Sequence, residues 1–262
     1  MGWVITKTSC DGIGNVMKGF LSAFSVNPDT TIECNPDYRL GNYASVLDSR
    51  HIYQGGPRED FYTCRLLVLR EEEEEQENIY NEFQYTNGCG NPNLNHHYSF
   101  TTLIDWNYDA SRISTRVKER ILGAIDRVVF QPHIVDSVDR YVSQFHPGKT
   151  LGISVRTWKA SHETNIDRPY DFQTYATAIR QHLPSVSTIV LSVDNEDVLP
   201  EYMELLRDRH VIVLRHKNDT QNAFLKMLTL AKCDVFVGNR ISTFSELVFW
   251  FSRCRIQVTP VF

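Results

Sequence analysis

The sequence predicts an α/β protein made of two Rossmann-like halves, residues 1–147 and 148–262. In the second half, short apolar runs alternate with segments of helical periodicity. The apolar runs are continuous, which is typical of parallel strands buried on both faces. The chain also opens with a strand, a glycine-containing turn and a helix, and this order indicates a second unit of the same kind. The turn-forming stretch at 146–149 marks the expected boundary.

The second half carries four strand–helix pairs. Each strand is a run of four to six mostly apolar residues, and each helix places its apolar residues on one side. The expected strands are 151–155, 188–193, 211–214 and 234–237, and the expected helices are 170–182, 198–206, 221–231 and 244–251.

The first half is regular only at its start and end. A strand at 3–6, a turn at 10–15, a helix at 16–24 and a strand at 31–34 begin it, and helices at 114–127 and 132–145 end it. Between them, the acidic run at 70–77 is expected to be a solvated loop or helix face. The Gly-, Asn- and Pro-rich stretch at 87–97 predicts a long loop.

Composition excludes several classes of protein. A chain of 262 residues with 42% hydrophobic content and a net charge of -5 is suited to a globular fold and lacks the overall basic charge of nucleic-acid-binding surfaces. No run approaches the about 18 apolar residues that cross a bilayer, and the N-terminus does not resemble a signal peptide. The six cysteines form no Cys-x-x-Cys pair, so we expect reduced thiols. The sequence therefore predicts a cytoplasmic protein with no nucleic-acid partner and no integral membrane segment.

Candidate binding residues follow the expected strands, where open parallel sheets bind ligands. Arg156 follows the strand at 151–155 and is suited to clamp a diphosphate, although a surface arginine paired with an acid is the alternative. Gly238 and Arg240 precede three small hydroxyl residues that can bind phosphate oxygens at a helix start, while helix capping accounts for only one of them. These three residues are Ser242, Thr243 and Ser245. The turn Gly12–Asn15 lacks the third glycine of the dinucleotide fingerprint, and it can equally be a plain strand-to-helix turn.

Together these segments resemble the fucosyltransferase-type superfamily of GT-B glycosyltransferases. This superfamily includes the nodulation and core alpha-1,6-fucosyltransferases and the protein O-fucosyltransferases. The similarity rests on segments that occur in the same order as the family motifs. They are Gly12-Ile13-Gly14-Asn15 with the helix after it, Phe130-Gln131-Pro132, Gly152-Ile153-Ser154-Val155-Arg156-Thr157, Val190 to Asn195, and Asp234 to Ser245.

The resemblance implies two Rossmann-like domains that face each other across a cleft, with 1–147 on the acceptor side and 148–262 binding the nucleotide sugar. Arg156 would be the essential arginine on the donor diphosphate, and Asp194 would hold the base or the second phosphate. The donor pocket would be completed by Gly14, Asn15, Arg240, Ser242, Thr243, Phe244 and Ser245. The chain departs from the family at Ser154, where the motif has histidine, and at Thr157, where it has a second arginine.

The resemblance also suggests a general base. Glu163 lies close to the offset at which some family members carry a catalytic glutamate, and a solvated loop residue is the alternative. His162 is a second candidate, because histidine titrates near neutral pH. The sequence has no Asp-x-Asp motif, and the pair His96 and His97 has no third ligand at a useful spacing. No metal and no other cofactor is therefore expected.

These features predict a metal-independent, inverting glycosyltransferase that uses GDP-fucose as its first-choice donor and a glycan or another hydroxyl compound as acceptor. The alternatives are another donor, such as UDP-xylose or GDP-rhamnose, and a nucleotide-sugar-binding protein without transfer activity. A Rossmann enzyme of different chemistry, a methyltransferase or a dehydrogenase, is a further alternative.

Overall fold

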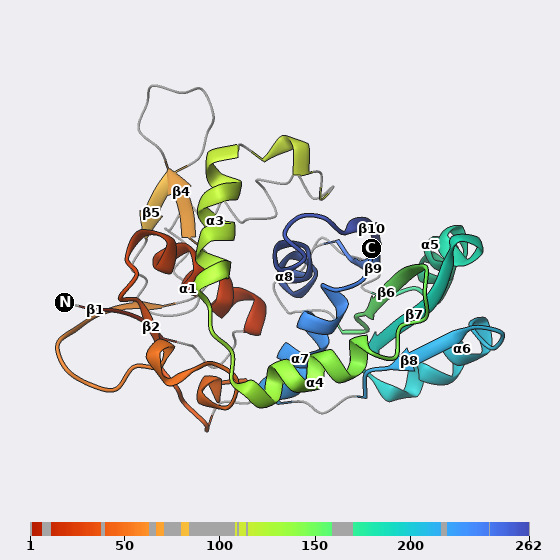
Figure 1. Ribbon diagram of the computed structural model, residues 1–262, viewed down its shortest axis with the longest axis horizontal. Helices are drawn as coiled ribbons and strands as arrows, with labels where there is room; N and C mark the ends of the chain where they lie inside the picture. The colour runs from red at the N-terminus through yellow and green to blue at the C-terminus, as the bar shows by residue number, and fades with distance from the viewer. Residues whose placement is uncertain are drawn as a thin grey trace. The chain divides into compact units, whose positions relative to one another are not determined.

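The structure is a computed structural model, and it describes most of the chain. The described residues are 2–6, 12–37, 40–62, 67–70, 80–83, 108, 110–113, 115–158, 170–215, 219–240 and 242–261. They form two units, Met1–Val135 with Asn218–Phe224, and Asp136–Lys217 with Leu225–Phe262. Figure 1 labels the elements of both units.

Within the described residues, the second unit contains a parallel sheet of five strands in the order β10-β9-β6-β7-β8. The predicted strands are confirmed, with ends that differ by up to two residues. The strands are β6 (Lys149–Val155), β7 (Val186–Val193), β8 (His210–Val213), β9 (Val235–Asn239) and β10 (Gln257–Val261). The sequence did not predict β10, because it contains Pro260. This proline is tolerated because β10 pairs on one side only, with β9.

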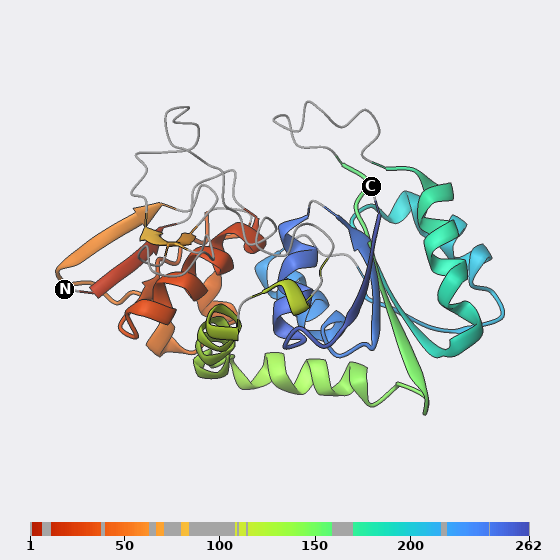
Figure 2. The same cartoon turned by 90° about the horizontal axis from the view of Figure 1, so that it is seen from above.

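Helices cover both faces of this sheet, as Figure 2 shows. Two of them, α5 (Phe172–His182) and α6 (Leu199–Leu205), share a buried apolar cluster with β6 and β7. The opposite face carries α7 (Thr220–Leu230) and α8 (Thr243–Phe251). On that face, a Cβ at Gly152 would lie 3.0 Å from a methyl group of Leu230. The continuous apolar strands are thus explained by burial on both sides.

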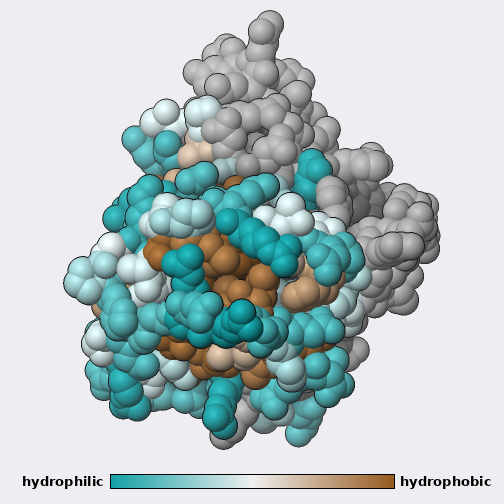
Figure 3. Space-filling model, turned by 90° about the vertical axis from the view of Figure 1, so that its right-hand side faces the viewer, coloured by the Kyte–Doolittle hydropathy of each residue, from teal (hydrophilic) through white to brown (hydrophobic). Residues whose placement is uncertain are grey.

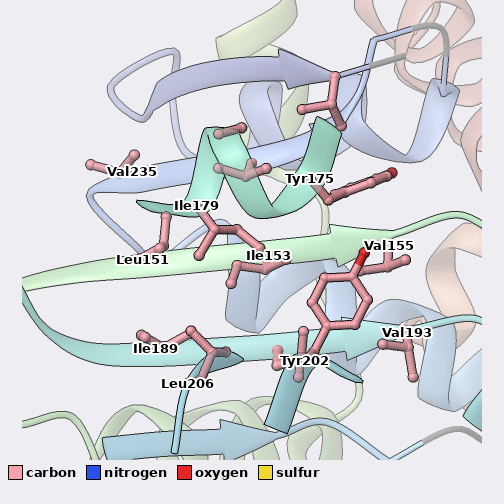
Figure 4. Close-up of a cluster of buried hydrophobic side chains, with 14 of the residues drawn as sticks. Leu151, Ile153, Val155, Tyr175, Ile179, Ile189, Val193, Tyr202, Leu206 and Val235 are labelled. Atoms are coloured by element: carbon pink, nitrogen blue, oxygen red, sulfur yellow. The ribbon is translucent and has the colours of Figure 1, made fainter. Parts of the chain in front are cut away.

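The cluster under α5 and α6 is drawn in Figure 4. Tyr175 and Tyr202 contribute their rings to it, and both phenol oxygens lie toward the carboxyl end of β6. Partly buried residues such as Phe172 and Leu199 continue the cluster outward. Figure 3 shows apolar side chains among polar ones on this side of the second unit.

The described cysteines agree with the expectation of reduced thiols. Cys34, Cys233 and Cys254 take part in no disulfide bond. Burial raises the pKa of the Cys233 thiol to about 12, so this side chain remains protonated and behaves as a small apolar residue. The other cysteines lie outside the described residues.

The first unit contains a parallel sheet of three described strands, one more than the two strands that the sequence predicted. Its described strands have the order β2-β1-β3 and are followed by an antiparallel pair, β4 with β5. No further strand–helix alternation follows β3 among the described residues, so the α/β class is confirmed and a Rossmann-like first half stays a prediction. The strands are β1 (Gly2–Thr6), β2 (Thr31–Ile32), β3 (Arg58–Tyr62), β4 (Leu67–Arg70) and β5 (Tyr80–Phe83).

The predicted helices of the first half are confirmed, with shifted ends. They are α1 (Ile13–Val26), α3 (Thr115–Arg127) and α4 (Pro132–Val142), the last of which continues into the second unit. Short 3-10 turns occur at Tyr43–Ser45, Ser49–His51, Ala110–Arg112, Leu183–Ser185 and Glu196–Val198. The predicted loop at 87–97 and residues 71–77 of the acidic run lie outside the described residues. No helix in the described part of the chain is long and apolar enough to cross a membrane.

A buried histidine joins the elements of the first unit. His51 packs edge-on against Phe20 and Phe24 of α1, with ring centroids 5.7 and 5.4 Å away. Its Nε2 accepts a hydrogen bond of 3.0 Å from the backbone N–H of Val129. Burial and the neighbouring Arg50 lower the pKa of His51, so the imidazole is neutral in the folded chain.

This histidine predicts a fall in stability at mildly acidic pH. Below about pH 6.5 the unfolded chain binds a proton at residue 51 that the folded chain excludes, so the free energy of unfolding decreases as the pH falls toward the lowered pKa. His51→Gln should cost about 1–3 kcal/mol at pH 8 and should flatten this decrease. Denaturant titrations at pH 8, 6.5 and about 5 measure both effects.

His182, whose pKa is also lowered by burial, contributes a second slope of the same sign that His51→Gln leaves in place. An unchanged pH dependence in His51→Gln would contradict the assignment.

Candidate functional site

Three polar residues follow neighbouring strands at the carboxyl edge of the larger sheet. The register pairs Val155 with Val193 and Ser154 with Gly238, so the ends of β6, β7 and β9 meet at this edge. Arg156, Asp194 and Arg240 are the first residues beyond these strands. The structure therefore brings together the charged residues that the sequence placed at strand ends.

Arg156 lies at the centre of this edge, because β6 is the middle strand of the sheet. Its backbone N–H donates to the phenol oxygen of Tyr175 at 3.2 Å. Its guanidinium lies over the ring of Trp158, with Cζ 4.3 Å from the ring centroid. The side chain of Trp158 is 57% exposed, so a cation supported by an aromatic face lies at the edge where a ligand of an α/β sheet binds.

Asp194 accepts hydrogen bonds from Thr157. The Thr157 backbone N–H lies 3.0 Å from both carboxylate oxygens, and the Thr157 hydroxyl donates to Oδ1 at 2.8 Å. The backbone N–H of Asp194 in turn donates to the carbonyl of Val155 at 3.3 Å. The contact that the sequence predicted, from Asp194 to a base or a second phosphate, stays a prediction.

The start of α8 lies at the same edge, directly after β9. Ser242 is the N-cap residue, but its side chain makes no capping hydrogen bond. Capping therefore does not account for this hydroxyl. Ser242, Thr243 and Phe244 are half-buried, whereas Ser245 is buried. The backbone N–H of Arg240 is held by the carbonyl of Val261 in β10 at 2.7 Å.

A further cation at this edge, beside Arg156 and Arg240, was not predicted. Lys226 belongs to α7 and is 7% exposed, and its Nζ lies 3.4 Å from the carbonyl of Val193 at the end of β7. The sequence offers little signal for it, because a lysine within a helix is usually solvated. Tyr175 and Trp158 were also missed as site residues. Tyr175 looked like an ordinary core residue of its helix, and Trp158 follows the motif rather than belonging to it.

Gly14 and Asn15 lie in the first turn of α1, which begins at Ile13 rather than at Val16 as predicted. Gly12 is the N-cap residue, and its carbonyl accepts from the N–H of Val16 at 3.3 Å. The predicted turn therefore contributes three residues, Ile13, Gly14 and Asn15, to the helix. Their role toward a donor stays a prediction.

Both candidate bases, Glu163 and His162, lie outside the described residues, as do His96 and His97. The described residues contain no group of three or more His, Cys, Asp or Glu side chains that could hold a metal ion.

Comparison with solved structures shows which proteins share this fold. The chain is 13% identical to POFUT1 in complex with GDP, with a TM-score of 0.53, and the match covers 99% of this chain and 98% of that one. It is 14% identical to NodZ alpha-1,6-fucosyltransferase soaked with GDP-fucose, with a TM-score of 0.53 and coverage of 97% and 92%. The chain is 13% identical to the fucosyltransferase NodZ from Bradyrhizobium, with a TM-score of 0.53, and the match covers 94% of this chain and 92% of that one.

No protein-family model and no curated protein sequence matches the chain. The resemblance suggested by the motifs is thus confirmed at the level of the fold, which this chain shares with POFUT1 and NodZ.

The geometry at the end of β9 predicts that Gly238 tolerates no side chain. A Cβ there would lie 2.5 Å from two ring atoms of Phe236 and 2.9 Å from the Ser245 hydroxyl. Gly238→Ala should therefore displace the start of α8 and destabilise the fold by about 1–3 kcal/mol. Thermal unfolding measures the loss. Gly123→Ala is the control, because a Cβ at Gly123 meets nothing within 4 Å. Equal stability of Gly238→Ala and wild type would contradict the prediction.

Proposed function

We propose that this chain is a metal-independent, inverting glycosyltransferase that moves a sugar from a nucleotide-diphosphate donor to a hydroxyl group of a glycan or another acceptor. The observation that carries the proposal is Arg156, a cation at the centre of the carboxyl edge of the larger sheet. GDP-fucose is the first-choice donor, because proteins of the same fold have been solved in complex with GDP and soaked with GDP-fucose. We assign donor binding to residues 148–262 and the acceptor side to residues 1–147, with Gly14 and Asn15 approaching the donor.

The diphosphate would be held by directional donors. The planar guanidinium of Arg156 can form two parallel hydrogen bonds to phosphate oxygens. The first N–H groups of α8, with the hydroxyls of Ser242 and Thr243, supply further donors near a partial positive charge. Arg240 adds a second positive charge at this edge. Charge that develops on the leaving diphosphate would thus be stabilised by residues already in place.

The transfer itself needs a base for the acceptor. The acceptor hydroxyl attacks the anomeric carbon, the bond from that carbon to the diphosphate oxygen breaks, and the configuration inverts. The hydroxyl proton goes to the base, for which Glu163 is our first candidate and His162 the second. Neither residue contacts the diphosphate in this scheme, so their replacement affects turnover more than donor affinity.

One observation favours donors other than GDP-fucose as a second candidate. Both carboxylate oxygens of Asp194 accept hydrogen bonds from Thr157, so this side chain has less capacity left for a nucleotide base than a solvated carboxylate. UDP-xylose, which carries a different base, therefore belongs in the first donor screen, and GDP-rhamnose is included as a donor that keeps the base and changes the sugar.

The proposal predicts stabilisation by a nucleotide diphosphate that depends on Arg156. A ligand at 100 times its dissociation constant adds about 2.7 kcal/mol to the free energy of unfolding, so GDP or UDP should raise Tm measurably. Arg156→Ala should lose this shift and lower transfer by about 10²–10³-fold, the usual cost of losing one charge-stabilising donor. Thermal-shift and transfer assays with GDP, UDP and their sugar conjugates measure both.

The control for this prediction is Arg180→Ala, an exposed arginine of α5 in the same unit. It should behave as wild type. Full transfer activity in Arg156→Ala would overturn the proposal, and donor binding without transfer or hydrolysis across a broad acceptor panel would replace it with a binding function. Stabilisation by NAD or S-adenosylmethionine but not by any nucleotide diphosphate would indicate different Rossmann chemistry.

The proposed base predicts a separation of turnover from donor binding. Glu163→Gln should lower kcat by about 10²–10⁴-fold, while the dissociation constant of GDP changes little. Steady-state kinetics and calorimetry on the same preparation test this. Unchanged turnover in Glu163→Gln together with a loss in His162→Gln would move the role to His162.

A further inference from the structure

We propose that Tyr175, Thr157 and Asp194 form a positioning network that fixes the backbone on both sides of the Arg156 α-carbon, and that Asp194 acts through Thr157 rather than by touching the donor. This inference rests on the proposed function, in which Arg156 binds the donor diphosphate. It assigns the residues that set the direction of the arginine.

The first part of the network closes the ends of β6 and β7. The backbone N–H and the hydroxyl of Thr157 donate hydrogen bonds to the Asp194 carboxylate, at 3.0 and 2.8 Å. The backbone N–H of Asp194 donates to the carbonyl of Val155 at 3.3 Å. The segment after β6 and the segment after β7 are thus linked by hydrogen bonds donated from each side.

The second part comes from α5, which packs on one face of the sheet. Tyr175 of α5 is fully buried, and its phenol oxygen accepts the N–H of Arg156 at 3.2 Å. Burial raises the pKa of this phenol, so it remains a neutral hydroxyl at any physiological pH. Consecutive backbone N–H groups, those of Arg156 and Thr157, are therefore bonded by side chains from α5 and from the end of β7.

The side chain of Arg156 is held as well. Its guanidinium lies 4.3 Å from the ring centroid of Trp158, which limits the rotamers available to it. An arginine whose backbone and side chain are both ordered before binding loses less conformational entropy when it binds a diphosphate. The network therefore favours the bound direction of the arginine.

The charges at this edge indicate why Asp194 is a positioning residue. A carboxylate that faced a diphosphate would repel it, unless donors satisfied its oxygens. Thr157 provides those donors to both oxygens. Lys226, with its Nζ 3.4 Å from the carbonyl of Val193, places a positive charge beside the same strand end.

The test compares variants that remove one link each. Thr157→Val removes the hydroxyl, Thr157→Ser restores it, Asp194→Asn replaces one acceptor by a donor, and Tyr175→Phe removes the acceptor for Arg156. Thr188→Val is the matched control, because the Thr188 hydroxyl bonds the N–H of His146 in the same unit, away from this edge. Tyr202→Phe is the control for Tyr175→Phe, because it removes a phenol hydroxyl from the apolar cluster that contains both tyrosines.

Calorimetry with GDP, UDP and inorganic pyrophosphate, transfer kinetics and amide hydrogen exchange are measured for each variant. Thr157→Val and Asp194→Asn should lose affinity and kcat/KM to a similar extent, up to about 10²-fold, since misplacement of a binding group by about 1 Å costs this much. Thr157→Ser should recover most of the loss, and Tyr175→Phe should show a smaller one. The amides of Arg156 and Thr157 should exchange faster in the network variants than in the controls.

Separate outcomes overturn the inference and the proposed function. A loss of affinity in Asp194→Asn, with wild-type exchange of the Thr157 amide in that variant and wild-type affinity in Thr157→Val, would mean that Asp194 contacts the ligand, and it would overturn the inference. Unchanged exchange at Arg156 and Thr157 in both variants would also overturn it. If wild type binds none of the nucleotides or pyrophosphate, the proposed function fails, and the exchange measurements alone decide whether the network exists.

Discussion

The pairing of β6 with β7 and β9, in a parallel sheet covered on both faces, is the constraint on which the candidate site depends. Parallel pairing brings the carboxyl ends of neighbouring strands to one edge, and burial of both faces keeps the register from slipping. Arg156, Asp194 and Arg240 are then adjacent without any long loop having to place them. The residues of the site directly follow buried strands of this sheet, and these strands limit their movement.

Close approach of backbone and helices maintains this edge. Gly238 allows the end of β9 to pass the ring of Phe236 and the Ser245 hydroxyl, and so lets α8 begin next to the strand ends. The N-terminal N–H groups of α8 then lie at the same sheet edge as Arg156. A partial positive charge and a full one therefore occur at one edge, an arrangement that favours an anionic ligand.

The likeness to POFUT1 and NodZ adds a fold to this geometry but not a chemistry, because the identities are 13–14%. The chain keeps the arginine of the motif and replaces the residue after it. At that position, Thr157 donates hydrogen bonds to Asp194 and orders the end of the strand.

Local periodicity by itself determined the α/β class, the predicted strands and helices of the second half, and the place of Arg156 after a buried strand, because these features depend on residues close together in the chain. It missed β10, whose Pro260 is acceptable only at a sheet edge, and it missed the strands β3, β4 and β5 of the first unit. The tertiary structure alone decided that Thr157 meets Asp194, 37 residues away in the sequence, and that the phenol of Tyr175 reaches the Arg156 backbone. Such contacts follow from strand order and helix placement, which the spacing of apolar residues does not encode.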